Sequence, residues 1–436
     1  MKSLVASNAY LSVVHDLIPG GAHTYAKGDD QYPEGLAPVI ERGAGCRVWD
    51  IDGNEYVEFG SGLRSNLLGH GFEPVVRAAR GWLDNGVNFV RPHRLELQAA
   101  ERLIELIPSA EMVKFGLNGS DATTAAVRLA RAYTGRDLVA VCHDQPFFST
   151  DDWFIGTTPM SAGIPEAARR LTLPFSYNDL PGLSPLFAAH PGQIAAVILE
   201  AETVQPPAPG YFGGLRRLCD QHGALLILDE TITGFRWHER GAQFVHGIEP
   251  DLCTFGKCLA NGFPISALAG RREVMRLGGF AEDADRVFLL SQTNGAQPWA
   301  LAAMLATIEA CEREQIAAQL HVTGGELRRR VEQVVAEAGL SSYFQLRGRD
   351  CNLVYVARDG DGQPSQAFRT LVLQELVERG VLAPSLVVCA AHDRAAIDQV
   401  TGAISELMPV YRRALEEGIG KVLRGRPVRP AIRTRG

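Results

Sequence analysis

The sequence predicts an α/β fold in which a mostly parallel sheet lies between layers of helices. Four apolar runs, at 137–142, 194–200, 224–230 and 251–257, are continuous rather than alternating, which is typical of strands buried on both faces. Helical patterns lie between strands along the chain, and this alternation favours parallel strands joined by helices. From about residue 320 the pattern changes, and a smaller α+β domain is predicted over 320–415.

The remaining elements follow in order. Residues 1–45 are turn-rich, and 46–59 predicts two strands around the Asp52-Gly53 turn. In the large domain we expect helices at 74–85, 95–106, 120–135 and 297–315, and a strand at 111–117. In the small domain we expect helices at 322–338 and 393–416, and strands within 344–356 and 381–389.

The amino-acid composition argues against several functional classes. The 436 residues include 43 Lys and Arg against 50 Asp and Glu, so the formal net charge of −7 gives no basic field for nucleic acid. No run of about 18 apolar residues predicts a membrane span, and the N-terminal stretch lacks the apolar core of a signal peptide. Eight scattered cysteines without C-x-x-C pairs favour free thiols over a metal site or disulfides. We therefore expect a cytoplasmic protein.

A polar turn after the strand at 111–117 is the first candidate site feature. Asn118, Gly119 and Ser120 lie at the start of the next predicted helix. The N–H groups and the positive dipole end of a helix start suit a phosphate. Taken alone, Asn118 or Ser120 could equally be a helix N-cap.

Two charged residues end apolar strands, where open α/β sheets bind their ligands. Asp229 needs a partner because an unpaired buried carboxylate is costly, although backbone N–H groups would also serve. A buried Lys257 would lose its proton and become nucleophilic, although it could instead extend to the sheet rim. Thr293, before the helix at 297–315, could be a cap or a further phosphate donor.

Together and in this order, these features predict a site for pyridoxal 5'-phosphate (PLP). The Lys257 amine would form a Schiff base with the cofactor's aldehyde. Asp229 would keep the pyridine nitrogen protonated, so that the ring can accept electrons from the reacting carbon. No G-x-G-x-x-G follows a predicted strand, so a dinucleotide-binding dehydrogenase is not favoured.

On these residues the chain resembles the class III, fold-type I PLP-dependent aminotransferases, and most of all the glutamate-1-semialdehyde 2,1-aminomutases. The matching segments cover about two-thirds of the chain: IPGG (18–21), DIDGNEY (50–56), LGHGFEPVV (68–76), ELIPSAEMVKF (105–115), RLARAYTGRD (128–137), LCDQHGALLILDETITGFR (218–236) and PDLCTFGKCLANGFPISALAGRREVM (250–275).

The resemblance implies domains and an assembly. A large PLP-binding domain with a seven-stranded sheet is expected at 61–315 and a small α+β domain at 316–436. The segment 1–60 is expected to join the small domain and to cover the active site. The family also implies a homodimer with shared active sites, in which Thr293 reaches the phosphate of the neighbouring subunit. No metal ion is implied.

Several cofactor positions depart from the family pattern. Asn118, Gly119 and Ser120 stand where the aminomutases carry Ser-Gly-Thr. The family's ring-stacking Tyr is matched by Phe147, with Phe148 as a close competitor. Thr231 replaces a Val and is expected under the opposite face of the ring.

The segment after the strand at 194–199 also differs. The family's Glu-Pro-Val is Glu200, Ala201 and Glu202 here. Glu200 is retained as a cofactor-contacting residue. Glu202 adds a carboxylate near the site, and its role stays open.

Three cations are the candidate substrate-binding residues. Lys27 stands where the aminomutases have the Arg that pairs with the substrate carboxylate, and it offers a point charge instead of a fork. Arg64 replaces a usual Gly, and Arg91 replaces a usual Ala. These changes favour an anionic amino compound or keto partner, although Arg64 and Arg91 could instead serve a dimer interface or surface ion pairs.

The expected activity is amino-group transfer. Lys257 would hold the cofactor and then move the proton as general base and acid. Elimination or epimerisation on the same scaffold is the alternative. A non-catalytic cofactor-binding protein is less favoured, because the lysine is present and no DNA-binding module is seen.

Overall fold

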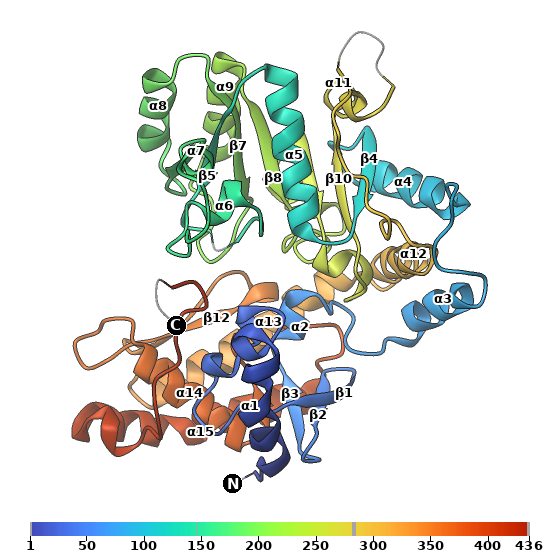
Figure 1. Ribbon diagram of the computed structural model, residues 1–436. Helices are drawn as coiled ribbons and strands as arrows, with labels where there is room; N and C mark the ends of the chain where they lie inside the picture. The colour runs from blue at the N-terminus through green and yellow to red at the C-terminus, as the bar shows by residue number, and fades with distance from the viewer. Residues whose placement is uncertain (1, 146, 281–284, 434–436) are drawn as a thin grey trace. The chain divides into compact units, whose positions relative to one another are not determined.

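The computed structural model describes residues 2–145, 147–280 and 285–433 (Figure 1). The chain divides into two compact units. The large unit comprises residues 64–66 and 73–318. The small unit comprises residues 1–63, 67–72 and 319–436.

The large unit is built on a seven-stranded sheet in the order β4-β10-β9-β8-β7-β5-β6. Its strands are β4 Met112–Gly116, β5 Leu138–Cys142, β6 Thr172–Phe175, β7 Ile194–Glu200, β8 Leu225–Asp229, β9 Leu252–Phe255 and β10 Ser266–Gly270. From β9 to β6 all neighbours are parallel, whereas β10 is antiparallel to both β9 and β4. The predicted mostly parallel sheet is confirmed, and β6 and β10 are strands that the apolar runs did not single out.

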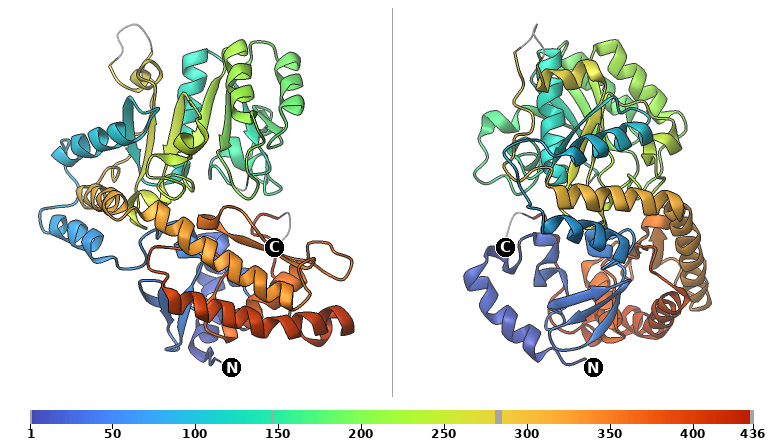
Figure 2. Two further views of the ribbon diagram at one scale, coloured as in Figure 1. Left: turned by 180° about the vertical axis from the view of Figure 1, so that it is seen from behind. Right: turned by 90° about the vertical axis from the view of Figure 1, so that its right-hand side faces the viewer.

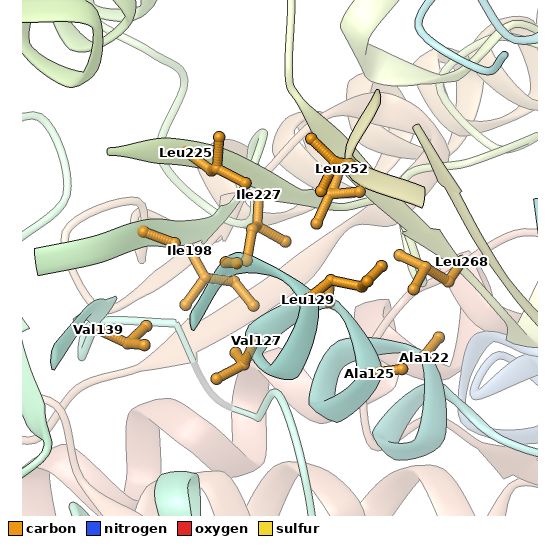
Figure 3. Packing of buried hydrophobic residues seen from close by; sticks show 14 of the residues in the cluster. Ala122, Ala125, Val127, Leu129, Val139, Ile198, Leu225, Ile227, Leu252 and Leu268 are labelled. Carbon is orange, nitrogen blue, oxygen red and sulfur yellow. The ribbon is translucent and has the colours of Figure 1, made fainter. Parts of the chain in front are cut away.

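Burial explains the continuous apolar runs. Every residue of β7, β8, β9 and β10 is buried. Helix α5 (Gly119–Thr134) lies against one face of the sheet, and α9 (Tyr211–His222) lies against the other (Figures 1 and 2). Figure 3 shows apolar side chains of α5 (Ala122, Ala125, Val127 and Leu129) facing those of the strands (Val139, Ile198, Ile227, Leu252 and Leu268). Each fully buried Leu or Ile in such a core contributes about 1.5–3 kcal/mol.

Further helices surround the sheet or connect its strands. They are α3 Glu73–Leu83, α4 Arg94–Leu106, α6 Asp152–Ile155, α7 Glu166–Arg169, α8 Leu180–Ala189, α10 Gly241–His246, α11 Arg272–Met275 and α12 Pro298–Arg313. Helix α13 (Ile316–Glu337) contains the division between the two units.

The small unit contains two small sheets and three long helices of its own. One sheet has the order β1-β2-β3-β13, and the other pairs β11 with β12. The elements are α1 Val5–Leu17, β1 Ile40–Ala44, β2 Arg47–Asp50, β3 Glu55–Glu58, β11 Phe344–Arg347, β12 Val354–Ala357, α14 Gln366–Glu378, β13 Val381–Leu382 and α15 Arg394–Glu417.

The structure also differs from the sequence-based elements in helix α1 and in the ends of two strands. Helix α1 lies in a stretch predicted to be turns, and its first N–H groups, at Ala6 and Ser7, donate to the distant Asp52 carboxylate. Strand β13 is shorter than the predicted 381–389, since Pro384 has no N–H for a ladder. Strand β9 ends at Phe255, before Lys257.

Among the described residues, none of the helices combines the length and the apolar character that crossing a membrane requires.

Candidate active site

Three neighbouring parallel strands bring the site's polar residues to one sheet edge. Glu200 at the end of β7 pairs in register with Asp229 at the end of β8, and Asp229 pairs with Thr254 of β9. Lys257 lies two residues after the end of β9. Residues far apart in the sequence therefore meet at the carboxyl edge of the sheet, as expected for an open α/β fold.

The Asp229 carboxyl is buried and only partly satisfied. Its Oδ1 atom accepts the N–H of Thr231 and the hydroxyl of Thr254, each at 2.9 Å. Burial raises the pKa of Asp229, whereas these donors and the Lys257 amine lower it in part. A carboxyl in this state would gain from a cationic partner, because a paired buried charge is far less costly than an isolated one.

Lys257 begins a short 3-10 turn, η4 (Lys257–Ala260), with a positive φ of 42°. This left-handed backbone is unusual for a residue with a side chain and is typical of functional sites. Burial lowers the pKa of the Lys257 amine, while the carboxyls of Glu200 and Asp229 raise it. Arg64 lowers it further. The net effect is a lowered pKa, which shifts Lys257 towards the neutral, nucleophilic amine.

Glu200 is fixed through its backbone rather than through its carboxyl. Gln145 binds it twice: Gln145 Nε2 donates to the Glu200 carbonyl at 2.8 Å, and the Glu200 N–H donates to Gln145 Oε1 at 2.7 Å. Within the described part of the chain, the two buried carboxyl oxygens of Glu200 have no hydrogen-bond partner. Burial and the neighbouring Asp229 raise the pKa of Glu200 to about 8, against the opposing effect of Lys257 and Arg64.

Arg64 is a predicted substrate cation that acts on this cluster. Burial lowers its pKa to about 10, with a further lowering by Arg236, and the Glu200 carboxyl opposes both. Its carbonyl accepts the Cys258 thiol at 3.1 Å, next to Lys257 in sequence. Arg64 itself has a φ of 73°, so its backbone is also left-handed.

The start of α5 confirms the capping role considered for Asn118. Asn118 Oδ1 accepts the N–H of Asp121 at 3.2 Å, and the Asp121 carboxylate accepts the N–H of Asn118 at 3.0 Å. The N–H groups of Gly119 and Ser120 have no carbonyl one helical turn before them, so they can bind an anion.

Close backbone approach shapes the space beside this helix start. A Cβ atom on Gly119 would lie 3.2 Å from the Thr231 side chain, and one on Gly256 would lie 3.2 Å from Thr231 Cγ2. Thr231 Oγ1 is buried and has no hydrogen-bond partner among the described residues. Glycine at 119 and 256 therefore allows three segments to converge on the Asp229 end of β8.

The two aromatic candidates differ in exposure. Phe148 is buried, and its carbonyl accepts the Thr123 hydroxyl at 2.7 Å. Phe147 is 44% exposed and contacts Phe154 edge-on, with ring centroids 5.7 Å apart. Phe147 is therefore the ring that is free to contact a ligand, while Phe148 belongs to the core.

Among the described residues, no hydrogen bond or ion pair joins Thr293 or Arg91 to this cluster, and Lys27 belongs to the other unit. Thr293 is exposed, and its carbonyl accepts the Asn88 side chain at 2.9 Å. Arg91 is exposed in the loop before α4. Lys27 is exposed and belongs to the small unit, in the 3-10 turn η2 (Tyr25–Lys27).

Sequence reasoning missed several residues that shape the site. Thr254, Gln145 and Gly256 contact the backbone or side chains of the predicted residues. Thr254 has a sequence signal, since it is a hydroxyl within an apolar strand. Gln145 has none, because only the tertiary fold brings it to the end of β7.

The family model for class-III aminotransferases matches residues 29–386. The chain belongs to this family. The glutamate-1-semialdehyde 2,1-aminomutase of Syntrophobacter fumaroxidans is 37% identical over 306 residues, which cover 67% of this chain and 69% of the relative. The aminomutase of Pelotomaculum thermopropionicum is 34% identical over 426 residues, which cover 92% and 96%.

A solved structure supports the same family. The FumI protein of Sphingopyxis sp. MTA144, in its PLP internal aldimine form, gives a TM-score of 0.85 at 27% identity and covers 94% of this chain and 97% of that chain. Family, relatives and fold together identify a fold-type I, PLP-dependent aminotransferase or aminomutase of class III. The resemblance stated from the sequence is confirmed.

The residues present fit PLP. The buried Asp229 carboxyl suits a protonated ring nitrogen, the orphaned Thr231 hydroxyl and Glu200 carboxyl suit polar groups of a ligand, and the start of α5 suits its phosphate.

Proposed function

We propose that this class-III enzyme moves an amino group between an anionic amino compound and a carbonyl acceptor, with Lys257 as the catalytic amine. One observation carries the assignment: the half-buried Lys257 side chain lies within electrostatic reach of Glu200, Asp229 and Arg64, and burial lowers the pKa of its amine. An amine in this setting can both attack an aldehyde and carry a proton near neutral pH.

Each residue of the site has a proposed task toward the cofactor. PLP supplies an electron sink for the carbon that loses its proton. Lys257 Nζ would be the attachment point for the aldehyde, and the Asp229 carboxylate would keep the ring nitrogen protonated. The N–H groups of Gly119 and Ser120 would bind the phosphate. Thr231 and Phe147 would contact the ring.

We assign the proton transfer steps to Lys257 Nζ. When free, the Lys257 amine would take the proton from the substrate carbon and deliver it to the cofactor carbon on the other side of the amino nitrogen. The lowered pKa of Lys257 suits this task, because the amine must be neutral to accept the proton. Asp229 stays charged opposite a cationic ring nitrogen.

We assign the substrate's anionic group to Arg64. Burial lowers the Arg64 pKa to about 10, and a buried guanidinium gains from a carboxylate partner, which can bind it in a bidentate manner. Lys27 and Arg91 are further candidates on sequence grounds.

We propose a cytoplasmic homodimer whose partner supplies Thr293. Val90 is 99% exposed, Phe288 is 71% exposed and Leu97 is 63% exposed on the large unit. Asn88, two residues before Val90, donates to the Thr293 carbonyl, so Thr293 lies close to the segment that carries this exposed apolar side chain. An apolar surface that borders a site residue favours an interface shared by two copies. Eight buried free cysteines fit a reducing compartment.

Spectroscopy with defined amino donors tests the function. We expect the purified enzyme to have a visible absorption band that borohydride abolishes, with the cofactor then fixed to the peptide containing Lys257. An accepted anionic donor should convert the cofactor to its amine form without an acceptor, and a neutral donor of equal size should do so more slowly. A reaction that consumes the donor without forming the amine form would indicate a lyase or epimerase.

Lys257→Ala gives the matched control. Turnover should fall to background while the circular dichroism spectrum stays unchanged, because the change removes only an amine and its chain. Retained activity in this variant would overturn the assignment of Lys257.

A further inference from the structure

Glu202 is a buried carboxylate that the proposed chemistry does not use. It is 3% exposed, and its Oε2 atom accepts Trp237 Nε1 at 3.1 Å and pairs with His246 Nε2 at 3.0 Å. Trp237 lies in the loop after β8, and His246 ends α10. Glu202 therefore joins three separate segments of the large unit.

Side chains from other parts of the chain form hydrogen bonds with each of the three consecutive residues 200–202, which begin at the last residue of β7. Gln145 binds the backbone of Glu200 twice. The Tyr177 hydroxyl donates to the Ala201 carbonyl at 2.5 Å. Glu202 is held by Trp237 and His246. This strand-end segment, residues 200–202, is thus fixed by partners from four other parts of the chain.

Stability alone gives a weak reason for this arrangement. A buried carboxylate with polar partners is often no more stable than a well-packed apolar side chain, because its desolvation is costly. The effect of this hydrogen-bond network is instead to fix the position of the segment. Glu200 has no hydrogen bond from any described residue to its carboxyl oxygens, so the path of its backbone sets where that carboxyl lies.

We propose that Glu202 is a positioning residue that, held by Trp237 and His246, fixes the 200–202 segment and so keeps the Glu200 carboxyl beside Lys257 and Asp229. The inference rests on the proposed role of Lys257. It assigns a task to a buried carboxylate that the proposed chemistry does not use.

The electrostatic consequence has a definite sign. Glu200 raises the pKa of Lys257. If the segment relaxes, Glu200 withdraws and the cation at Lys257 loses a stabilising charge, so its proton leaves at lower pH. The titratable groups that face Glu200 are Asp229, Lys257, Arg64, Cys142 and Tyr177.

The test is a pH titration of the bound cofactor's visible absorption in the holoenzyme, which requires no turnover. Glu202→Val should move the midpoint to lower pH by about half a unit or more, a threefold change in proton affinity. Glu202→Gln keeps an oxygen for Trp237 and should stay near the wild-type midpoint. Asp220→Asn, which removes an exposed carboxylate on α9, is the matched control and should not shift it.

A second variant tests the proposal in case Glu202→Val does not fold. Trp237→Phe keeps an aromatic ring, although a smaller one, and removes the N–H donor, and it should shift the midpoint in the same direction as Glu202→Val. An unchanged midpoint in a folded Glu202→Val enzyme overturns the proposal, and so does an unchanged midpoint in Trp237→Phe if Glu202→Val does not fold. A wild-type band that is insensitive to borohydride would instead overturn the role of Lys257, and the inference with it.

Discussion

At the residue scale, the three ionisable groups at the sheet edge are held in different ways. Asp229 has two donors on one oxygen, Glu200 is held by its backbone, and Lys257 lies on a left-handed turn. Their pKa values move in the directions that favour neutral forms, since burial acts on all three. A bound cation at Asp229 changes this balance, which is why the cofactor matters for the electrostatics as well as for the chemistry.

Replacing Asp229 should weaken cofactor binding. In Asp229→Ala the ring nitrogen loses its counter-charge, and the hydroxyl of Thr254 loses its acceptor. We expect the Kd for PLP to rise at least about tenfold, the equivalent of about 1.4 kcal/mol, with slower proton transfer. Fluorescence titration of the PLP-free protein measures the Kd. Thr254→Val, which removes only one donor to Asp229, is the milder control, and a PLP affinity unchanged in Asp229→Ala would contradict the assignment.

Replacing Glu200 should change how stability depends on pH. The folded pKa of about 8 lies above the ordinary value of 4.5, so the contribution of protonated Glu200 is complete below about pH 4.5 and is lost as the pH rises through 8. Glu200→Gln cannot ionise. Relative to wild type, the PLP-free variant should therefore gain stability across this window, by up to about 1.4 kcal/mol per pH unit.

Thermal unfolding of both proteins between pH 5 and 8.5, about the range of the predicted change, measures the difference. Parallel stability curves for wild type and Glu200→Gln would show that Glu200 titrates normally. Glu378→Gln, a carboxyl in the small unit that binds Arg424, serves as the control for a general effect of charge removal.

At the element scale, helix α5 has two functions: it packs on the sheet, and its N-terminal end forms part of the site. Its apolar side packs on the sheet, and its first turn presents N–H groups beside Thr231. The reciprocal bonds between Asn118 and Asp121 fix where the helix begins. The exact start of the helix decides which N–H groups remain for a phosphate, so the cap and the binding site depend on each other.

Removing the cap should cost stability. Asn118→Ala loses the side-chain acceptor for the Asp121 N–H, and we expect the free energy of unfolding to fall by about 1 kcal/mol. Urea unfolding of the PLP-free protein measures the loss. Asn118→Ser keeps a capping oxygen and should lie close to wild type. Equal stability of Asn118→Ala and wild type would mean that the cap contributes nothing.

At the scale of the whole molecule, the proposed dimer makes a prediction that a single chain does not. If Thr293 serves the neighbouring active site, two inactive variants should complement each other. Lys257→Ala lacks the catalytic amine, and Thr293→Glu places a negative charge where a phosphate should bind. In a mixed dimer, one site would combine an intact Lys257 with an intact Thr293 from the other chain.

We expect a mixture of the two proteins, unfolded and refolded together, to regain activity up to about a quarter of wild type, since half the molecules would be mixed and each would hold one complete site. Each variant refolded alone gives the background. No recovery, with mixed dimers confirmed by mass, would show that Thr293 acts in its own chain or in no site.

The sequence by itself determined the α/β class, the apolar strands and the residues at their ends, because burial on both faces requires continuous apolar runs and a lone charge at such a run's end stands out. It also determined the family, through motifs that include Asp229 and Lys257. Local patterns could not give the helix at Val5–Leu17, whose cap comes from Asp52, or the antiparallel strand β10, whose direction depends on its neighbours.

Only the tertiary structure decided how the site is held. It showed that Phe148 is buried whereas Phe147 is exposed. It placed Arg64 and Glu200 where their charges act on Lys257. It also brought Trp237 and His246 to Glu202. The physical reason is that hydrogen bonds and electrostatic effects act through space, between residues that no sequence spacing relates. Gln145 and Glu200, bound to each other twice across 55 positions of the chain, illustrate this.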